Sequence, residues 1–436
     1  LYSRGKTATR RSEKFLDEQN LPYSILSNIY QKLLNLSIKT LVQELQVSKI
    51  AGELKGETKE DRYSYYFTHF LSQPEHRMEI LYNYPVLTRI LVEETKKGVQ
   101  EHLKVIQRLD SDFEKIEQLF KKDFSRLKSV ESDMGDTHQQ GQSVMILNFS
   151  SGEKLVYKPR SLATDLHFNQ LLNWVNEKNY SFQIKTIKVL NKQKYGWQEF
   201  VNHQECSTYA EVKQFYTRLG GLIAILYILE ATDFHLENII ASGADPFLID
   251  MESIFQNSFD TETSKSAIAK TVEELNNSVF RTGVLPIKFS ANSLDPEYSG
   301  VGGEEQELQL ENYVLDSIGT DNMRMVLKKV PFGGKENRPF IDKNYAEPEN
   351  YSDEIISGFQ NMYSLFILNK DELISESGPI YWFKNDSVRF IPRATQTYAT
   401  FQYSSYHPKY LMKGEDRVRL FNILADSSKR ASNYKQ

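Results

Sequence analysis

The sequence is almost free of cysteine. Cys206 is the single cysteine among 436 residues, so an intramolecular disulfide and a cysteine-rich zinc site are both excluded. His235 is one of eight histidines, but none of them forms the HExxH pair of a zinc hydrolase. We therefore expect no zinc in this segment, and a reducing compartment such as the cytoplasm.

Long apolar runs and an excess of positive charge are also missing. No apolar stretch of roughly 18 residues occurs, which argues against a transmembrane segment, and the first residues lack the apolar core of a signal peptide. The formal net charge of −5 provides no basic surface for a nucleic acid. A peptide or a small molecule is therefore a more fitting partner. The absent initiator methionine and the abrupt end suggest a fragment of a longer protein.

Helical periodicity dominates the first part of the chain. Apolar residues such as Ile38, Leu41 and Leu45 recur at spacings of three and four. The same spacing from Glu101 to Lys128 predicts one long amphipathic helix. We therefore expect a helical N-terminal unit over residues 1–128.

The spacing of apolar residues then changes from helical to strand-like, which predicts a small β-rich lobe over residues 129–205. Segments 143–149 and 154–158 flank a Ser-Ser-Gly-Glu turn, which is typical of a β-hairpin, and further strands are expected over 182–190 and 197–201. Lys158 ends the second hairpin strand, from where its charge can reach ATP phosphates. Taken alone, a solvent-exposed strand-end lysine is the ordinary alternative.

A mainly helical large lobe is expected over residues 206–436. Thr208 and Glu211 form a capping-box pattern before an apolar helical segment. That segment leads into a loop with Asp233, His235 and Asn238, and an apolar strand then precedes Asp250 and Glu252, the next acidic residues of the expected site.

This order of polar residues fits phosphoryl transfer. The reaction needs a carboxylate or a histidine to accept the proton of the attacking hydroxyl, and an asparagine with a later aspartate to hold Mg²⁺. Each residue alone has a structural alternative, with Asp233 capping a turn, His235 in the core and Asp250 ending a strand. Their combination favours the catalytic interpretation.

Six short motifs also occur in order along the chain. They are Gly135-Asp-Thr-His-Gln-Gln-Gly-Gln-Ser-Val, Lys154-Leu-Val-Tyr-Lys-Pro-Arg-Ser-Leu, Thr232-Asp-Phe-His-Leu-Glu-Asn, Leu248-Ile-Asp-Met-Glu, Thr282-Gly-Val-Leu-Pro and Arg389-Phe-Ile-Pro-Arg-Ala-Thr-Gln-Thr-Tyr. Together they resemble the dehydratase domain of class II lanthipeptide synthetases, from about residue 130 to 412. The helical first part is less distinctive.

This resemblance implies an α+β fold with a two-lobed, lipid-kinase-like core and an added helical N-terminal unit. It implies ATP-dependent phosphorylation of Ser and Thr in a precursor peptide, recognised through its leader, followed by elimination of phosphate to dehydroalanine or dehydrobutyrine. The implied cofactors are ATP and Mg²⁺. A zinc-dependent cyclase domain is expected to follow in the full-length protein.

Matching residues can be assigned motif by motif. The phosphorylation positions are Lys158, Asp233, His235, Asn238, Asp250 and Glu252, with Asn238 and Asp250 as the metal ligands. Asp136 and His138 match a further motif of the active-site region. Arg389 and Thr395 match the elimination positions, and their side chains would share one face if this segment were a strand.

Two other functions fit parts of the same pattern. A kinase that stops at the phosphorylated product would use the residues from Lys158 to Glu252 equally well, and only the segment from Arg389 to Thr395 separates it from a dehydratase. A non-catalytic peptide-binding pseudokinase is the third candidate. The intact Asp233, Asn238 and Asp250 argue against it.

Overall fold

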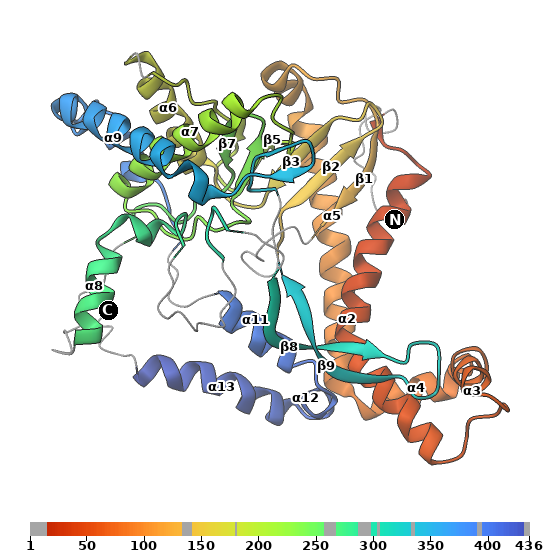
Figure 1. Cartoon of the computed structure of the whole chain (residues 1–436). Helices are drawn as coiled ribbons and strands as arrows, with labels where there is room; N and C mark the ends of the chain where they lie inside the picture. The colour runs from red at the N-terminus through yellow and green to blue at the C-terminus, as the bar shows by residue number, and fades with distance from the viewer. Residues whose placement is uncertain are drawn as a thin grey trace.

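The computed structural model describes residues 15–132, 142–178, 181–256, 267–286, 298–302, 306–332, 336–389 and 395–430. Its architecture is mixed α+β, mostly helical with one five-stranded antiparallel sheet (Figure 1). None of the described helices is long and apolar enough to cross a bilayer. Asp136 and His138 lie outside the described residues, so their predicted roles stay predictions.

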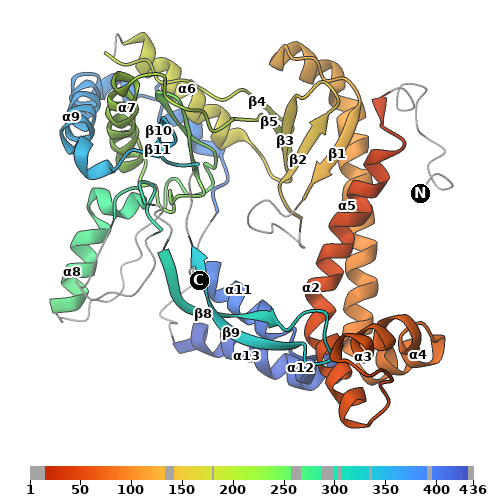
Figure 2. The same ribbon diagram turned by 45° about the vertical axis from the view of Figure 1, so that its right-hand side comes forward.

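Two long helices, α2 (Asn20–Ile50) and α5 (Pro85–Phe120), lie side by side at the N-terminal end (Figures 1 and 2). Their far ends are joined through α3 (Lys59–Tyr65), the π-helix η2 (Tyr66–Phe70) and α4 (Pro74–Asn83). The prediction of helical structure in this region is therefore confirmed.

The predicted end of the second long helix is wrong. Helix α5 ends at Phe120, because Lys121 adopts a left-handed conformation with φ 55° and its N–H closes the last turn on the Glu117 carbonyl. Strand β1 (Leu127–Glu131) then begins within the expected helix. Neither glycine nor proline marks this point, and the helical spacing of apolar residues continues across it.

The sheet has the order β1-β2-β3-β5-β4. Strands β2 (Met145–Phe149) and β3 (Lys154–Lys158) form the predicted hairpin, with Ile146 opposite Val156. The two later strands are shorter than expected. These strands are β4 (Val189–Asn191) and β5 (Gly196–Glu199), and helix α6 (Ala163–Glu177) lies between β3 and β4 in the chain.

One face of the sheet packs against α2 and α5. Leu21, Leu109 and Ile116 from the helices share a buried apolar cluster with Leu155 and Trp197 from the strands. Burial of this kind contributes roughly 25 cal/mol per Å² of apolar surface. The long helices therefore belong to the same packed body as the sheet.

A buried carboxylate joins α5 to the sheet as well. Asp112 Oδ2 accepts hydrogen bonds from Tyr195 Oη at 2.8 Å and Trp197 Nε1 at 2.9 Å, and Oδ1 lies 2.7 Å from Lys192 Nζ. Burial alone would raise the pKa of Asp112, but these three donors outweigh it and hold the pKa below its ordinary value.

The helix α7 (Tyr209–Ile228) leads directly to the predicted catalytic loop. Its N-cap Thr208 accepts from the Glu211 N–H, as the capping pattern predicts, but the Glu211 carboxylate accepts from the N–H of Ser207 instead of Thr208. The elements that follow are the hairpin β6 (Ile239–Ser242) and β7 (Asp245–Leu248), α8 (Ala267–Asn276), η4 (Val279–Thr282), β10 (Phe340–Ile341), β11 (Asn344–Tyr345), η5 (Pro348–Tyr351), α9 (Ser352–Leu368), α10 (Lys370–Leu373) and η6 (Tyr381–Asn385).

Helices α7 and α9 approach each other through glycine. A Cβ atom at Gly220 would lie 2.0 Å from the Ile355 carbonyl oxygen, and one at Gly358 would lie 1.9 Å from the Thr217 carbonyl oxygen. Only residues without a side chain permit this backbone contact. The close approach fixes α7, and hence the start of the loop that follows it.

A long hairpin, β8 (Gln306–Asp316) and β9 (Arg324–Phe332), returns to the N-terminal helices (Figure 2). In its turn, the fully buried Asp321 carboxylate lies 2.6 Å from Arg62 Nε and 3.2 Å from Lys49 Nζ. The last helices, α11 (Thr395–Ser404), α12 (Pro408–Met412) and α13 (Gly414–Arg430), follow, and α12 packs against α2 and α5.

We predict that Asp112→Ala destabilises the protein by about 3 kcal/mol, since it leaves buried donors and a cation without their shared acceptor. Because the pKa of Asp112 is low in the folded protein, this contribution is present above the unfolded pKa and is lost as pH falls through the folded pKa. Urea unfolding of the wild type and the variant at several pH values measures this difference in the free energy of unfolding. Glu117→Ala, on the exposed side of α5, is the matched control, and equal midpoints for the two variants would refute the prediction.

Candidate functional site

The sheet presents two cations at the end of β3. Lys158 is only 5% exposed, and its ammonium donates a hydrogen bond to the Ile249 carbonyl and lies 3.6 Å from Asp165 Oδ1. Burial lowers the pKa of Lys158, and the Asp165 carboxylate opposes that effect. The alternative of a solvent-exposed strand-end lysine is therefore wrong.

Arg160, two residues later, joins three carboxylates. Its Nη1 lies 2.7 Å from Asp165 Oδ2, its Nη2 lies 2.5 Å from Asp250 Oδ1, and its Nε lies 2.7 Å from Glu252 Oε1. Burial alone would lower the pKa of Arg160, but the carboxylates, led by Asp165, outweigh it and raise the pKa. The planar guanidinium donates hydrogen bonds to Asp165 and Asp250, and it suits these pairs because it offers donors in several fixed directions.

We refer to Lys158, Arg160, Asp165, Asp250 and Glu252 as the Arg160 cluster. Lys158 ends β3, Arg160 follows that strand, Asp165 belongs to α6, and the other two members lie after β7. Arg160 and Asp165 are site residues that the sequence motifs alone did not predict. The available signal was the Lys-Pro-Arg segment, in which a second cation follows a strand whose neighbours are apolar.

Charge within the cluster is unbalanced. Two cations face three carboxylates. Burial, and to a lesser extent the nearby charge of Asp250, raises the pKa of Glu252 to about 7. The positive charges of Arg160 and Arg389 act in the opposite direction. Asp250 is the most accessible carboxylate, with its side chain 33% exposed against 11% for Glu252. The cluster therefore presents negative charge toward solvent at Asp250.

The predicted catalytic loop lies beside the cluster. The side-chain Nδ2 of Asn238 donates to the backbone carbonyl of Asp233 at 2.8 Å, and the Ile249 N–H donates to the backbone carbonyl of Asn238 at 3.0 Å. These contacts bring Asn238 next to the segment that carries Asp250, as the sequence order predicts. Asp233 has a φ of 68°, a conformation that non-glycine residues adopt with strain and that occurs often at functional sites.

His235 is not a core histidine. Its side chain is 28% exposed, and Nε2 lies 3.7 Å from Asp233 Oδ1, whose own side chain is 41% exposed. The pair can therefore receive a proton from a group that approaches from solvent.

Gly300 packs directly against the loop that carries Asp233 and His235. A Cβ atom at Gly300 would lie 2.7 Å from the Phe234 carbonyl oxygen and 2.6 Å from Ile239 Cδ1, and Phe234 itself is fully buried. The Gly300 N–H donates to the Gly283 carbonyl at 2.9 Å. The loop that carries Asp233 and His235 thus rests on a backbone surface with no room for a side chain.

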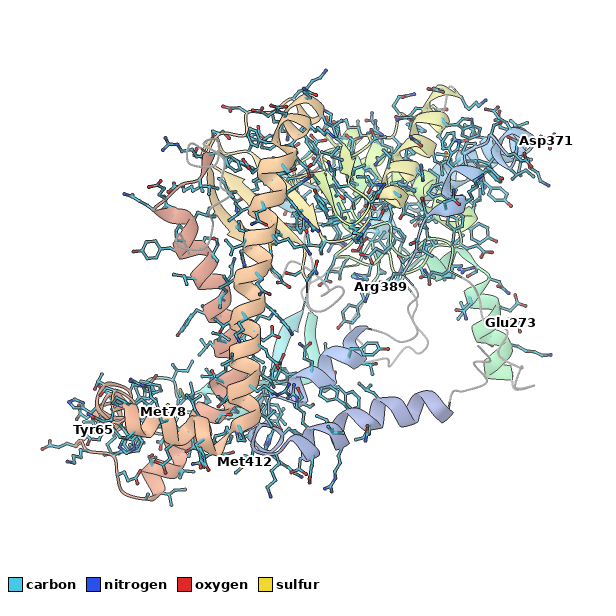
Figure 3. The ribbon with its side chains drawn as sticks, turned by 180° about the vertical axis from the view of Figure 1, so that it is seen from behind. Tyr65, Met78, Glu273, Asp371, Arg389 and Met412 are labelled. Atoms are coloured by element: carbon cyan, nitrogen blue, oxygen red, sulfur yellow. The ribbon has the colours of Figure 1, made fainter. Side chains whose placement is uncertain are left out.

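Arg389 lies next to the cluster. Its N–H donates to the Glu252 carbonyl at 2.8 Å, its carbonyl accepts from Gln256 Nε2 at 2.6 Å, and its positive charge acts to lower the pKa of Glu252. Figure 3 shows Arg389 at the lower edge of the part of the molecule that contains the sheet. The preceding segment is tied to α6, because His167 Nδ1 lies 2.7 Å from Asp386 Oδ2.

Thr395 is placed only by its backbone, as the first residue of α11. The idea that Arg389 and Thr395 share one strand face is therefore wrong, since Arg389 lies outside any strand and Thr395 begins a helix. The position of the Thr395 side chain lies outside the described part of the chain.

The donor types around Asp250 fit a hard cation. Asn238 and Asp250 supply amide and carboxylate oxygens from neighbouring backbone positions. Across the described residues, no group of three or more His, Cys, Asp and Glu side chains is arranged to hold a metal. Mg²⁺ in phosphoryl-transfer sites takes one or two carboxylates and completes its shell with substrate phosphates and water. Asn238 and Asp250 are therefore of the chemical types that Mg²⁺ prefers.

Comparison with known proteins gives two relationships. A family model described as "Domain of unknown function (DUF4135)" matches residues 84–436. The "Lacticin 481/lactococcin biosynthesis protein LcnDR2" of Lactococcus lactis subsp. lactis is 26% identical over 442 residues. That alignment covers 94% of this chain and 46% of the relative, so the chain spans about half of the relative's length.

We predict that Gly300→Ala destabilises the protein by about 1–3 kcal/mol, because the added methyl group must push against the Phe234 carbonyl. Gly414→Ala is the control, since a Cβ atom there meets nothing within 4 Å. Thermal unfolding of both variants tests this, and an unchanged midpoint for Gly300→Ala would show that the loop can relax.

Proposed function

We propose that this chain, which belongs to the DUF4135 family, is the dehydratase portion of a lanthipeptide synthetase. It phosphorylates Ser and Thr side chains of a precursor peptide and then eliminates the phosphate. The observation that carries the proposal is that the Arg160 cluster, the loop from Asp233 to Asn238 and Arg389 lie together. The relationship to a lacticin 481 biosynthesis protein supports the choice of substrate.

A kinase-like core is part of this proposal. A five-stranded antiparallel sheet carries Lys158, the following helix α6 carries its partner Asp165, and α7 leads to the loop and the β6–β7 hairpin. Phosphoryl transfer depends on this combination of a lysine from the sheet and oxygen ligands from the loop and hairpin. The arrangement supports a two-lobed catalytic core.

In the proposed first step, the hydroxyl oxygen of a Ser or Thr attacks the γ-phosphorus of ATP. The bond from that phosphorus to the bridging oxygen breaks and ADP leaves, while Asp233 or His235 receives the hydroxyl proton. Lys158, which is buried, would supply a positive charge to the phosphates. Asn238 and Asp250 would hold Mg²⁺, which when bound with ATP would neutralise charge on the transferring group.

In the proposed second step, a base removes the Cα proton of the phosphorylated residue. The freed electron pair forms the Cα=Cβ bond, and the C–O bond to phosphate breaks. Phosphate departs with roughly −1.5 to −2 charges, so its departure needs a cation. Arg389 can hold two phosphate oxygens through its guanidinium, and Thr395 adds a hydroxyl donor.

The partners follow from the same proposal. The substrate is a Ser/Thr-rich precursor peptide with a leader, and a cyclase domain in the full-length protein takes up the dehydrated product. Mass spectrometry of a co-incubated precursor separates the candidate functions, because phosphorylation adds about 80 Da and dehydration removes about 18 Da. A product that stays phosphorylated indicates a kinase, and absent ATP turnover indicates a non-catalytic peptide-binding protein.

We predict that Asn238→Ala and Asp250→Ala each lower phosphorylation by about 100-fold or more, because the proposed metal loses a ligand. The chain should still fold, since Asp165 and Glu252 remain to pair with Arg160. ATP turnover and peptide mass measure the effect. Asp371→Ala, far from Arg389 in Figure 3, is the control. Near-normal phosphorylation by either site variant would contradict the metal assignment.

We predict a different defect for Arg389→Ala and Thr395→Ala. Both variants should still consume ATP, but they should accumulate phosphorylated Ser or Thr because the leaving phosphate lacks its donors. Asp250→Ala, by contrast, should produce neither phosphate ester nor alkene. Complete dehydration by both variants, or failure of both at phosphorylation, would exclude these two residues from the elimination step.

A further inference from the structure

Arg160 contacts its three carboxylates unequally. Two guanidinium nitrogens reach Asp165, at 2.7 and 3.3 Å, whereas one nitrogen reaches Asp250 and one reaches Glu252. The Asp165 side chain is 5% exposed and belongs to the first turn of α6. Arg160 is therefore anchored by Asp165 and reaches outward to Asp250.

The Asp250 carboxylate is already engaged. Its Oδ1 atom lies 2.5 Å from Arg160 Nη2 and accepts a hydrogen bond from the Glu252 N–H at 3.2 Å. A divalent cation bound to the same carboxylate would stand close to the guanidinium. At such a separation the two positive charges repel each other, and the buried ion pair with Asp165 holds Arg160 in place.

We propose that Arg160 is a positioning residue that acts as the built-in counter-ion of Asp250 and competes with a divalent cation for its carboxylate. This inference rests on the proposed function, in which Asp250 is a metal ligand. Its consequence is that a cation binds poorly alone. The cation enters together with an anionic ligand whose phosphates compensate the guanidinium charge.

The test is a titration of the intact protein with Mn²⁺ in the absence of nucleotide, followed by electron paramagnetic resonance of the free ion. Arg160→Gln should bind Mn²⁺ on the order of tenfold more tightly than the wild type, because a competing charge is removed. Tighter binding is the opposite of what simple structural damage produces. Sites elsewhere in the protein are common to all variants and cancel in the comparison.

Two controls separate competition from general effects. Arg160→Gln with Asp165→Asn removes one charge of each sign, so it keeps the wild-type net charge and should still bind Mn²⁺ more tightly. It also serves as the folded variant if Arg160→Gln alone fails to fold. Arg218→Gln breaks a similarly buried pair with Asp245, 3.1 Å apart, and should leave Mn²⁺ binding unchanged.

The outcomes distinguish this inference from the proposed function. Adding Asp250→Asn to Arg160→Gln should abolish the gain in Mn²⁺ affinity. If the gain persists without the Asp250 carboxylate, the metal assignment of the proposed function fails. If Asp250→Asn weakens Mn²⁺ binding but neither Arg160 variant strengthens it, the counter-ion role of Arg160 is overturned while the metal assignment stands.

Discussion

Burial of a single guanidinium governs the arrangement of the site. Arg160 can be buried only if carboxylates meet it, and Asp165, Asp250 and Glu252 reach it from two separate parts of the chain. The end of β3, the first turn of α6 and the segment after β7 must therefore be positioned together. Because the Arg389 N–H donates a hydrogen bond to the Glu252 carbonyl, the same constraint extends to the C-terminal third of the chain.

Residues proposed for the two chemical steps contact the same segment of the chain. The Ile249 N–H donates to the Asn238 carbonyl, the Lys158 ammonium donates to the Ile249 carbonyl, and the Arg389 N–H donates to the Glu252 carbonyl. In the proposed function, residues of both steps therefore contact the segment from Ile249 to Glu252. The observed proximity thus supports consecutive reactions without release of the peptide.

Sequence patterns predicted those features that depend on neighbouring residues. The β2–β3 hairpin follows from alternation around a turn, and the Thr208 cap of α7 follows from a spacing of three residues. The end of α5 was mispredicted because Lys121 takes a left-handed conformation without glycine. Arg160 was missed because its partners Asp165 and Asp250 lie 5 and 90 residues away, and one sequence does not show which side chains meet in space.

The hairpin of β8 and β9 has a consequence for the order of folding during synthesis. Gln46, on α2, donates a hydrogen bond to the Asp321 carbonyl, which is 275 residues further along the chain. At roughly 5–20 residues per second, the ribosome needs on the order of tens of seconds to deliver that partner. Throughout this interval the far end of α2 lacks its final contacts, so a nascent chain exposes it to chaperones and proteases long after the helix itself has formed.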